Sequence, residues 1–414
     1  MKYNINERPK TMKEWLLFAC QQVMSVFIAT ILIAKICGTP ISSCLVGAGI
    51  GTFVYLLCTD YKSPVFISSC GATAGAIISA LALGGYIAAA IGGFIMFSVY
   101  LIIAFLVKKK GLAIINKIMP MHIIGAITMV IGINLAGFIP TYLQVNGETL
   151  QAAVIVALIT MVAIALLANY GKGIIKNIPF LLGLLIGYGV ALVLTLLNVA
   201  PLIDLSIFKD MKLFIIPDFT FKYWDFSKVD LALLIELLVL FIPVSLAGIC
   251  EHYSDHMVLS NIIGTDLTKE PGLDKTLLGD GLASFIGTIL CGLPNTTYGE
   301  SIATVGFSKV ASTAVIGLAA IIIEILAFIG PIQYFILSIP SCVFAGAAMI
   351  LYGYIASSGL KTLINNKVDL DNSKNLITVS VIITTGVSGI YLFNSAFSGV
   401  SIALVLGIIL NKIL

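Results

Sequence analysis

Two short polar clusters interrupt a chain that is otherwise strongly apolar. Residues 251–256 hold Glu251, His252, Asp255 and His256, and residues 294–300 end in Glu300. Ionisable groups at the depth of a bilayer are costly and usually mark the route of a substrate or an ion. Carboxylates accept hydrogen bonds and exchange protons, so the two clusters predict a polar binding site inside a membrane.

The spacing of the first cluster suggests how it is presented. Glu251 and Asp255 are four residues apart, as are His252 and His256, so each pair shares a face if the chain is helical there. A carboxylate at that depth must be protonated, paired or hydrogen-bonded to a ligand. We therefore expect Glu251, Asp255 and Glu300 to take part in proton coupling. The alternative is that residues 251–256 face water at a helix end.

Metal chemistry has weaker support in these clusters. The order of residues 251–256 does not reproduce H-E-x-x-H, and the third histidine, His122, is distant in sequence, so no metal site is expected. Asp280 lies just inside an apolar run and is expected to cap a helix N-terminus. The roles of Glu236 and Glu324, inside other apolar runs, stay open.

Composition identifies the class of protein. Of 414 residues, 59% are hydrophobic and 10% charged, with a mean hydropathy of +1.09. Soluble domains carry roughly 25% charged residues. Long continuous apolar runs, such as 152–168, indicate helical spans rather than the alternating strands of a membrane barrel. The net charge of +3 gives no reason to expect a nucleic-acid partner, and eight singly scattered cysteines predict no disulfide framework.

About fourteen apolar segments are expected when a span is taken as ~20 residues. They cover 14–36, 40–57, 64–81, 84–107, 118–139, 150–168, 178–199, 229–250, 273–292, 295–308, 310–329, 334–354, 375–393 and 396–412. With a cytoplasmic N-terminus, most of the 23 Lys and Arg residues fall on the cytoplasmic side. The positive-inside rule then places both termini in the cytoplasm. A short amphipathic surface helix is expected at 355–372.

The third and tenth segments are short, and they occupy matching places in two seven-span halves. Each opens with a proline, Pro64 or Pro294, and continues with small polar residues. Broken segments at matching positions are typical of a midplane site built from an inverted repeat. We expect short extended stretches there, because irregular backbone at this depth is tolerated where it lines a cavity or is buried in protein.

At these residues the chain resembles the nucleobase–ascorbate transporter family, and its uracil permease branch in particular. The resemblance is carried by Glu251-His252, the string P-N-T-T-Y-G-E at 294–300, Leu351-Tyr352-Gly353, and residues 356–359. It implies an all-α polytopic membrane protein of two inverted repeats, divided into a core and a gate. The core would hold spans 1–4 and 8–11, and the gate spans 5–7 and 12–14. The corresponding ranges would be 1–139 (core spans with gate span 5), 140–228 (gate), 229–330 (core) and 331–414 (gate).

The same resemblance implies a function and a set of roles. It implies proton-coupled uptake of a nucleobase, most simply uracil, at a bacterial plasma membrane, with the proton as coupling ion, no other cofactor, and a homodimer formed through the gate. Glu251 and Glu300 would accept the ring N–H groups. Tyr352 would line the pocket from the gate side. The carbonyl oxygens of the base would contact the backbone of Cys70, Gly71, Ala72, Thr73 and Gly299.

Some residues depart from the family pattern. Asp255 stands where uracil permeases often carry histidine, and the aromatic residue expected in the third segment is missing near Ala72. The open alternatives are a carrier of xanthine, uric acid or another purine, an anion carrier of the same fold, a channel, and an intramembrane metal-dependent enzyme.

Overall fold

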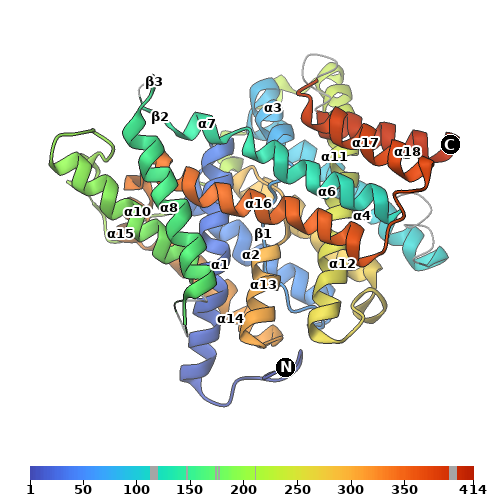
Figure 1. The fold of residues 1–414 in the computed structure, drawn as a ribbon, viewed down its shortest axis with the longest axis horizontal. Coiled ribbons are helices and arrows are strands. Elements are labelled where there is room, and N and C mark those ends of the chain that lie inside the picture. Colours follow the sequence, from blue (N-terminus) through green and yellow to red (C-terminus); the bar gives the residue numbers. More distant parts are fainter. Residues whose placement is uncertain (112–119, 146–147, 173–174, 176–177, 210, 391–398) are drawn as a thin grey trace.

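The computed structural model describes residues 1–111, 120–145, 148–172, 175, 178–209, 211–390 and 399–414, and most of these residues are helical (Figure 1). The helices are α1 (Met12–Cys37), α2 (Ile41–Cys58), α3 (Ala74–Gly84), α4 (Tyr86–Lys110), α6 (Met121–Ala136), α7 (Ile139–Tyr142), α8 (Gln151–Tyr170), α10 (Pro179–Leu196), α11 (Leu231–Ile263), α12 (Leu273–Cys291), α13 (Gly299–Ser308), α14 (Thr313–Phe328), α15 (Gly330–Ser338), α16 (Ser341–Asn365), α17 (Ser373–Val387) and α18 (Gly399–Ile413). The strands are β1 (Ile67–Ser69), β2 (Gln144–Val145), β3 (Glu148–Thr149) and β4 (Asn295–Thr297). Single turns are η1 (Leu205–Phe208), η2 (Thr220–Tyr223), η3 (Phe226–Lys228) and η4 (Thr268–Gly272).

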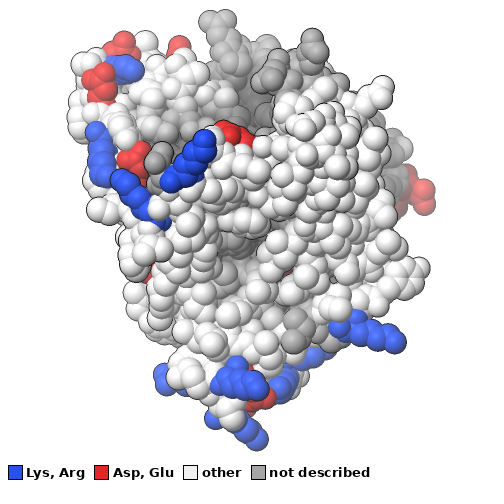
Figure 2. Space-filling model, turned by 90° about the vertical axis from the view of Figure 1, so that its left-hand side faces the viewer, with Lys and Arg blue, Asp and Glu red and all other residues white. Residues whose placement is uncertain are grey.

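The surface is that of a membrane protein. Eight of the described helices are long and apolar enough to cross a bilayer, and shorter apolar helices accompany them. Figure 2 shows one face of the molecule, on which the Lys and Arg side chains gather toward opposite ends and a broad band between them is almost uncharged. Exposed large hydrophobic residues lie on these helices, among them Phe94, Phe105, Ile155 and Leu166. In water such a surface would aggregate, whereas lipid tails can cover it.

Two sets of helices pack mainly among themselves. In the first set, α12 packs against α2 and α4, α14 packs against α1 and α2, and α11 packs against α4. In the second set, α16 packs against α6 and α8, α10 packs against α8, and α17 packs against α6 and α18. Figure 1 shows α6 and α16 side by side across the middle of the view, with α8 and α10 on the left. Contacts of α11 with α6 and α18, and of α1 with α10 and α16, join the two sets.

The predicted twelfth segment, 334–354, is wrong. α15 ends at Ser338, and α16 begins only at Ser341 and continues to Asn365. The break lies at Ile339, whose backbone is extended because the proline that follows it disfavours helical geometry. The surface helix expected at 355–372 is mostly the continuation of α16. Although its sequence is partly polar, one face of this part of α16 is buried and includes Gly359 and Leu363.

The predicted broken segments are confirmed. The third consists of β1 followed by the short helix α3, and the tenth consists of β4 followed by the short helix α13. The ends of the predicted thirteenth and fourteenth segments that fall on 391–398 lie outside the described residues.

The eighth span is longer than the sequence pattern indicates. α11 has 33 residues, with Pro243 inside it, and is therefore roughly 50 Å long at 1.5 Å per residue. Glu251 lies four residues past its central residue, Ala247, which is about 6 Å along the axis. The cluster at 251–256 thus sits on continuous helix near its middle, and the alternative of a water-facing helix end is wrong for His252 and His256, which are buried.

Close packing of α6 on α16 should be sensitive to one added methyl group. A Cβ atom at Gly359 would lie 2.3 Å from the Met129 backbone nitrogen and 2.5 Å from the Gly125 carbonyl oxygen. We expect Gly359→Ala to lower the free energy of unfolding by about 1–3 kcal/mol, since backbone must move. The measurement is thermal unfolding of the purified protein in detergent.

The matched control is Gly353→Ala on the same helix, where an added Cβ would meet no atom within 4 Å. It should leave the transition temperature unchanged or slightly raised, because alanine favours helix. Equal transitions for the two variants would contradict the close packing.

Candidate functional site

The two broken segments cross and pair with each other. β1 and β4 form an antiparallel pair in which Ile67 lies opposite Thr297, Ser68 opposite Thr296 and Ser69 opposite Asn295. The pairing extends beyond the strands, because the Cys70 amide donates to the Pro294 carbonyl at 2.8 Å. In this way backbone groups that no helix satisfies find partners in the membrane interior.

Side chains from neighbouring helices fix β4 in place. The Asn295 amide nitrogen donates to the carbonyls of Gly47 on α2, at 2.9 Å, and Ala283 on α12, at 3.0 Å. The Ser284 hydroxyl donates to the Asn295 carbonyl. Since Asn295 is fully buried, these bonds replace the hydration that its amide nitrogen and its backbone carbonyl lose.

β1 is held from its other side. Thr52 on α2 donates to the Ile67 carbonyl at 3.0 Å and accepts from the Ile67 amide at 3.1 Å. The hydroxyls of Thr30 on α1 and Ser68 are 2.6 Å apart. The pair of strands is therefore a fixed platform rather than a loop.

The strands lead into the N-terminal ends of two half-helices. α3 begins after Thr73, and α13 begins at Gly299. The first backbone N–H groups of a helix have no intrahelical acceptor, and the helix dipole makes this end positive, so both ends suit oxygen atoms of a ligand. Of the backbone expected to meet substrate, the amide of Cys70 is already used by Pro294. The helix starts at Thr73 and Gly299 keep this capacity.

Glu251 on α11 presents a carboxylate oxygen that no described residue satisfies. Its side chain is half-buried, and its Oε2 atom is fully buried with no hydrogen-bond partner among the described residues. It lies within electrostatic range of Glu300 and Asp280. A buried acceptor of this kind is costly unless a ligand or a proton satisfies it.

Asp255 is placed one turn further along α11. It is 8% exposed, and its Oδ2 atom accepts from the Thr297 hydroxyl at 2.9 Å. Its neighbours in electrostatic range include Glu251 and Glu300. This hydrogen bond joins β4 directly to Asp255, which we expect to take part in proton coupling.

Glu300 faces the second set of helices. It lines a narrow cleft together with Ser25 of α1, Phe180 of α10 and Leu351 of α16. The cleft has room for about one water molecule. Tyr352 follows Leu351, is buried, and lies in electrostatic range of Tyr298 and Tyr142. The structure thus brings Glu251, Glu300, Asp255 and Cys70 together, and Tyr352 is near Tyr298, the residue that precedes α13.

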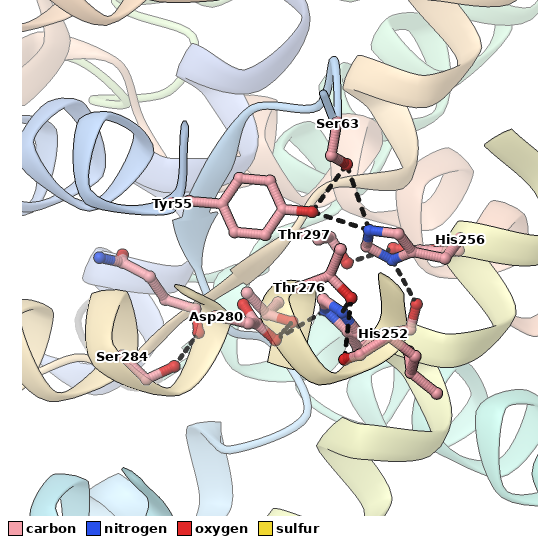
Figure 3. Close-up of polar contacts among 12 residues, drawn as sticks. Tyr55, Ser63, His252, His256, Thr276, Asp280, Ser284 and Thr297 are labelled. Atoms are coloured by element: carbon pink, nitrogen blue, oxygen red, sulfur yellow. Dashed lines mark hydrogen bonds and ion pairs between the residues drawn. The ribbon is translucent and has the colours of Figure 1, made fainter. Parts of the chain in front are cut away.

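The expectation that Asp280 caps a helix N-terminus is wrong. Asp280 lies seven residues into α12, is fully buried, and its Oδ2 atom is 3.0 Å from Nδ1 of His252 (Figure 3). Thr296 of β4 is at the limit of hydrogen bonding to the same oxygen, at 3.5 Å. α12 begins at Leu273, where the predicted span 273–292 also begins, so Asp280 lies about two turns inside the helix and too far from its N-terminus to cap it.

Several polar residues near the site were missed by the sequence reasoning. Figure 3 shows Tyr55 and Ser63 pointing at His256, and Thr276 pointing at His252. Gln22 of α1 also binds Ser301 of α13. A single Tyr, Ser or Thr inside an apolar run does not indicate a functional site. Asp280, a carboxylate between two glycines in such a run, did give a recognisable signal.

Comparison with solved structures identifies the fold. The transmembrane domain of a cyanobacterium bicarbonate transporter, BicA, aligns with a TM-score of 0.62 and 15% identity, covering 87% of this chain and 98% of that one. Murine Slc26a9, an anion transporter, aligns with a TM-score of 0.68 and 12% identity, covering 98% and 69%. This chain has the same fold of two inverted seven-span repeats.

Comparison of sequences identifies the family. Residues 13–395 match the model of a permease family. The uracil permease of Bacillus subtilis is 36% identical over 97% of this chain and 92% of its own length, and that of Bacillus caldolyticus is 35% identical over 99% and 94%. The uracil permease of Escherichia coli is 32% identical over 99% and 93%. The chain belongs to this permease family, the nucleobase–ascorbate transporter family.

The contact between α1, β1 and α13 at Ser301 gives a test of the platform. The Ser301 hydroxyl donates to Gln22 at 2.9 Å and accepts from the Phe66 amide at 3.0 Å. Ser301→Ala leaves both partners buried and unpaired, which should lower the free energy of unfolding by about 1–3 kcal/mol. Denaturant or thermal unfolding in detergent measures it.

Ser79→Ala on α3 is the control, since the exposed Ser79 hydroxyl bonds only to its own helix at Gly75. If Ser301→Ala were as stable as Ser79→Ala, the bonds at Ser301 would not support the crossing.

Proposed function

We propose that this protein carries uracil across the bacterial plasma membrane together with protons. The support is its membership of the permease family, the uracil permeases among its relatives, and a carboxylate-lined site at the crossing of two broken helices. Uracil has two ring N–H donors and two carbonyl oxygens. Its donors match the two carboxylates, and its oxygens match the helix N-termini.

The observation that carries the proposal is the unpaired carboxylate of Glu251. Its buried Oε2 atom needs a donor, and Glu300 lies within electrostatic range of it. Two carboxylates facing one space repel each other unless a proton or a donor ligand lies between them. A nucleobase with N–H groups supplies such donors, and a bound proton neutralises the remaining negative charge. This links substrate binding to proton binding at one place.

We further propose that transport proceeds by movement of a core against a gate. The core would be the first set of helices with both strands, and the gate the second set. Glu251, Glu300 and Asp255 lie in the core, whereas Tyr352 and Phe180 lie in the gate. The narrow cleft at Glu300 runs between the two sets, so sliding of one set against the other would open the site.

The gate also offers the surface for the expected homodimer. Large apolar side chains of α8 and α10 are exposed, including Ile155, Val162 and Leu185. Lipid and a second copy suit this surface equally well. Cross-linking of the protein in native membranes would distinguish them, and a monomer there would rule out the dimer.

The second candidate substrate is a purine such as xanthine. It also presents N–H donors to carboxylates, and the aromatic residue that the family resemblance leads one to expect in the third segment is missing near Ala72. Competition between labelled uracil and unlabelled xanthine for uptake decides between them. Uracil should compete at far lower concentration.

The main test uses purified protein in proteoliposomes with an inward proton gradient. Wild type should accumulate labelled uracil with saturation, and removing the gradient should abolish accumulation. Glu300→Gln replaces a charged acceptor by an amide and should reduce uptake by about tenfold or more, as hydrogen bonds to charged groups contribute about 1.5–3 kcal/mol.

A parallel variant addresses Glu251. Glu251→Gln should weaken uracil binding by about tenfold or more for the same reason, measured by titration calorimetry. Glu236→Gln is the matched control, because Glu236 lies on the same helix with its side chain exposed. If Glu251→Gln bound uracil as well as Glu236→Gln does, Glu251 would lie outside the site.

A further inference from the structure

A second ionisable pair lies between α11 and α12, next to β4. His252 on α11 and Asp280 on α12 are both completely buried, and Nδ1 of His252 is 3.0 Å from Oδ2 of Asp280. The other imidazole nitrogen, Nε2, is 3.0 Å from the Thr276 hydroxyl. Oδ1 of Asp280 and Nδ1 of His252 are both buried with no hydrogen-bond partner among the described residues, so Nδ1 and Oδ2 meet at ion-pair distance without an aligned hydrogen bond.

This pair changes its net charge with a single proton. With one exchangeable proton shared between the carboxylate and the imidazole the pair is neutral, and without it the pair is an anion. Breaking up a buried pair of this kind is strongly unfavourable, since a single buried charge is left without a partner. Exchange of one proton, by contrast, needs only a route to water.

A series of polar side chains leads away from the pair (Figure 3). The rings of His252 and His256 lie side by side, with centroids 4.1 Å apart. Nε2 of His256 is 2.7 Å from the Tyr55 hydroxyl and 3.3 Å from the Ser63 hydroxyl, and those two hydroxyls are 2.7 Å apart.

The chain of side chains ends close to a surface. Ser63 follows the turn after α2, in which Tyr61 is exposed. The surrounding loop carries the ion pairs Lys62–Glu270 and Lys275–Asp60. Since α2 runs back toward the start of α1, this is the end that carries the N-terminal segment, and its lysines predict that it faces the cytoplasm.

The pair is also coupled to the substrate site. Thr296, which approaches Asp280 at 3.5 Å, neighbours Thr297, which binds Asp255. Carboxylates of the site lie in electrostatic range of Asp280, so its charge affects theirs. The titratable groups that face the pair from the elements around it are Tyr55 of α2, Tyr100 of α4, Cys70 after β1, and Glu251, Asp255 and His256 of α11, with Glu300 of α13 beyond Glu251.

We propose that His252 and Asp280 form a proton-exchange pair that is separate from the carboxylates that bind substrate. The pair accepts the coupling proton from the site and releases it to the cytoplasmic end through His256, Tyr55 and Ser63. No bond other than those to the proton is made or broken. This inference rests on the proposed proton-coupled transport, and it gives the proton a way out that differs from the route of the nucleobase.

The experiment compares wild type with His252→Gln and Asp280→Asn, which keep hydrogen-bonding capacity but cannot share the proton. Two readouts are taken from the same proteoliposomes: exchange of labelled for unlabelled uracil at equal pH, and proton uptake driven by uracil, followed with an internal pH dye. Each variant should lower the ratio of proton uptake to exchange by about tenfold or more, the effect of one pKa unit or more at the coupling group. Tyr55→Phe should lower the ratio in the same direction.

Three outcomes are decisive. Proton uptake equal to wild type in both variants would overturn the proposal. Exchange and proton uptake falling in parallel would also overturn it, because the pair would then only support the fold. The double variant should match the single variants, since either change disables the same unit. Thr160→Val, a buried hydroxyl of α8 bonded within its own helix, is the control and should leave the ratio unchanged.

A readout without substrate separates this inference from the proposed function. Infrared difference spectra of the purified protein between acidic and alkaline pH should contain a carboxyl band that Asp280→Asn removes. If wild type failed to transport uracil but this band were present, the function would be wrong and the proton-exchange pair would stand. If transport were confirmed and the band unchanged in Asp280→Asn, the pair would be excluded.

Discussion

Every backbone N–H and C=O group in a membrane interior needs a partner, and this constraint explains the centre of the molecule. Two spans are broken, and each break exposes backbone groups that a helix would satisfy. Pairing of β1 with β4 satisfies them, and Asn295, Thr52 and Ser284 satisfy those that remain. The break then leaves two helix N-termini directed at one place in the bilayer. The site is thus a product of the same pairing that stabilises the fold.

The same geometry determines where the carboxylates of the site lie. α11 passes the crossing near its middle and presents Glu251 and Asp255, while α13 begins with Gly299 and Glu300. Asp255 is bonded to β4 through Thr297, whereas Glu251 has a buried oxygen with no partner among the described residues. One carboxylate therefore supports the platform and another is available to a ligand. Asp280 and His252 add a neutralisable pair between α11 and α12, next to Thr296 of β4.

The sequence predicted the broken segments, because prolines in apolar runs are strong signals, and carboxylates in such runs singled out Glu251, Asp255 and Glu300. It also predicted the inverted-repeat fold. The register that places Ser68 opposite Thr296 depends on contacts more than two hundred residues apart, so no local pattern reveals it. Asp280 was assigned to a cap although the predicted span 273–292 already placed it inside the helix, because its partner His252 lies on another helix and no local pattern reveals that contact. The start of α16 was placed too early, although Pro340 marked the break.

The most direct test of the account uses a ligand rather than a variant. In the proposed site, the carboxylates of Glu251 and Glu300 accept the ring N–H groups of the base. The measurement is displacement of labelled uracil from the purified protein by unlabelled uracil and by 1,3-dimethyluracil, which keeps both carbonyls but has no N–H donor. The account predicts that the dimethyl compound binds about 100-fold more weakly or worse, because two hydrogen bonds to charged acceptors are lost. Displacement by both compounds at similar concentrations would contradict it.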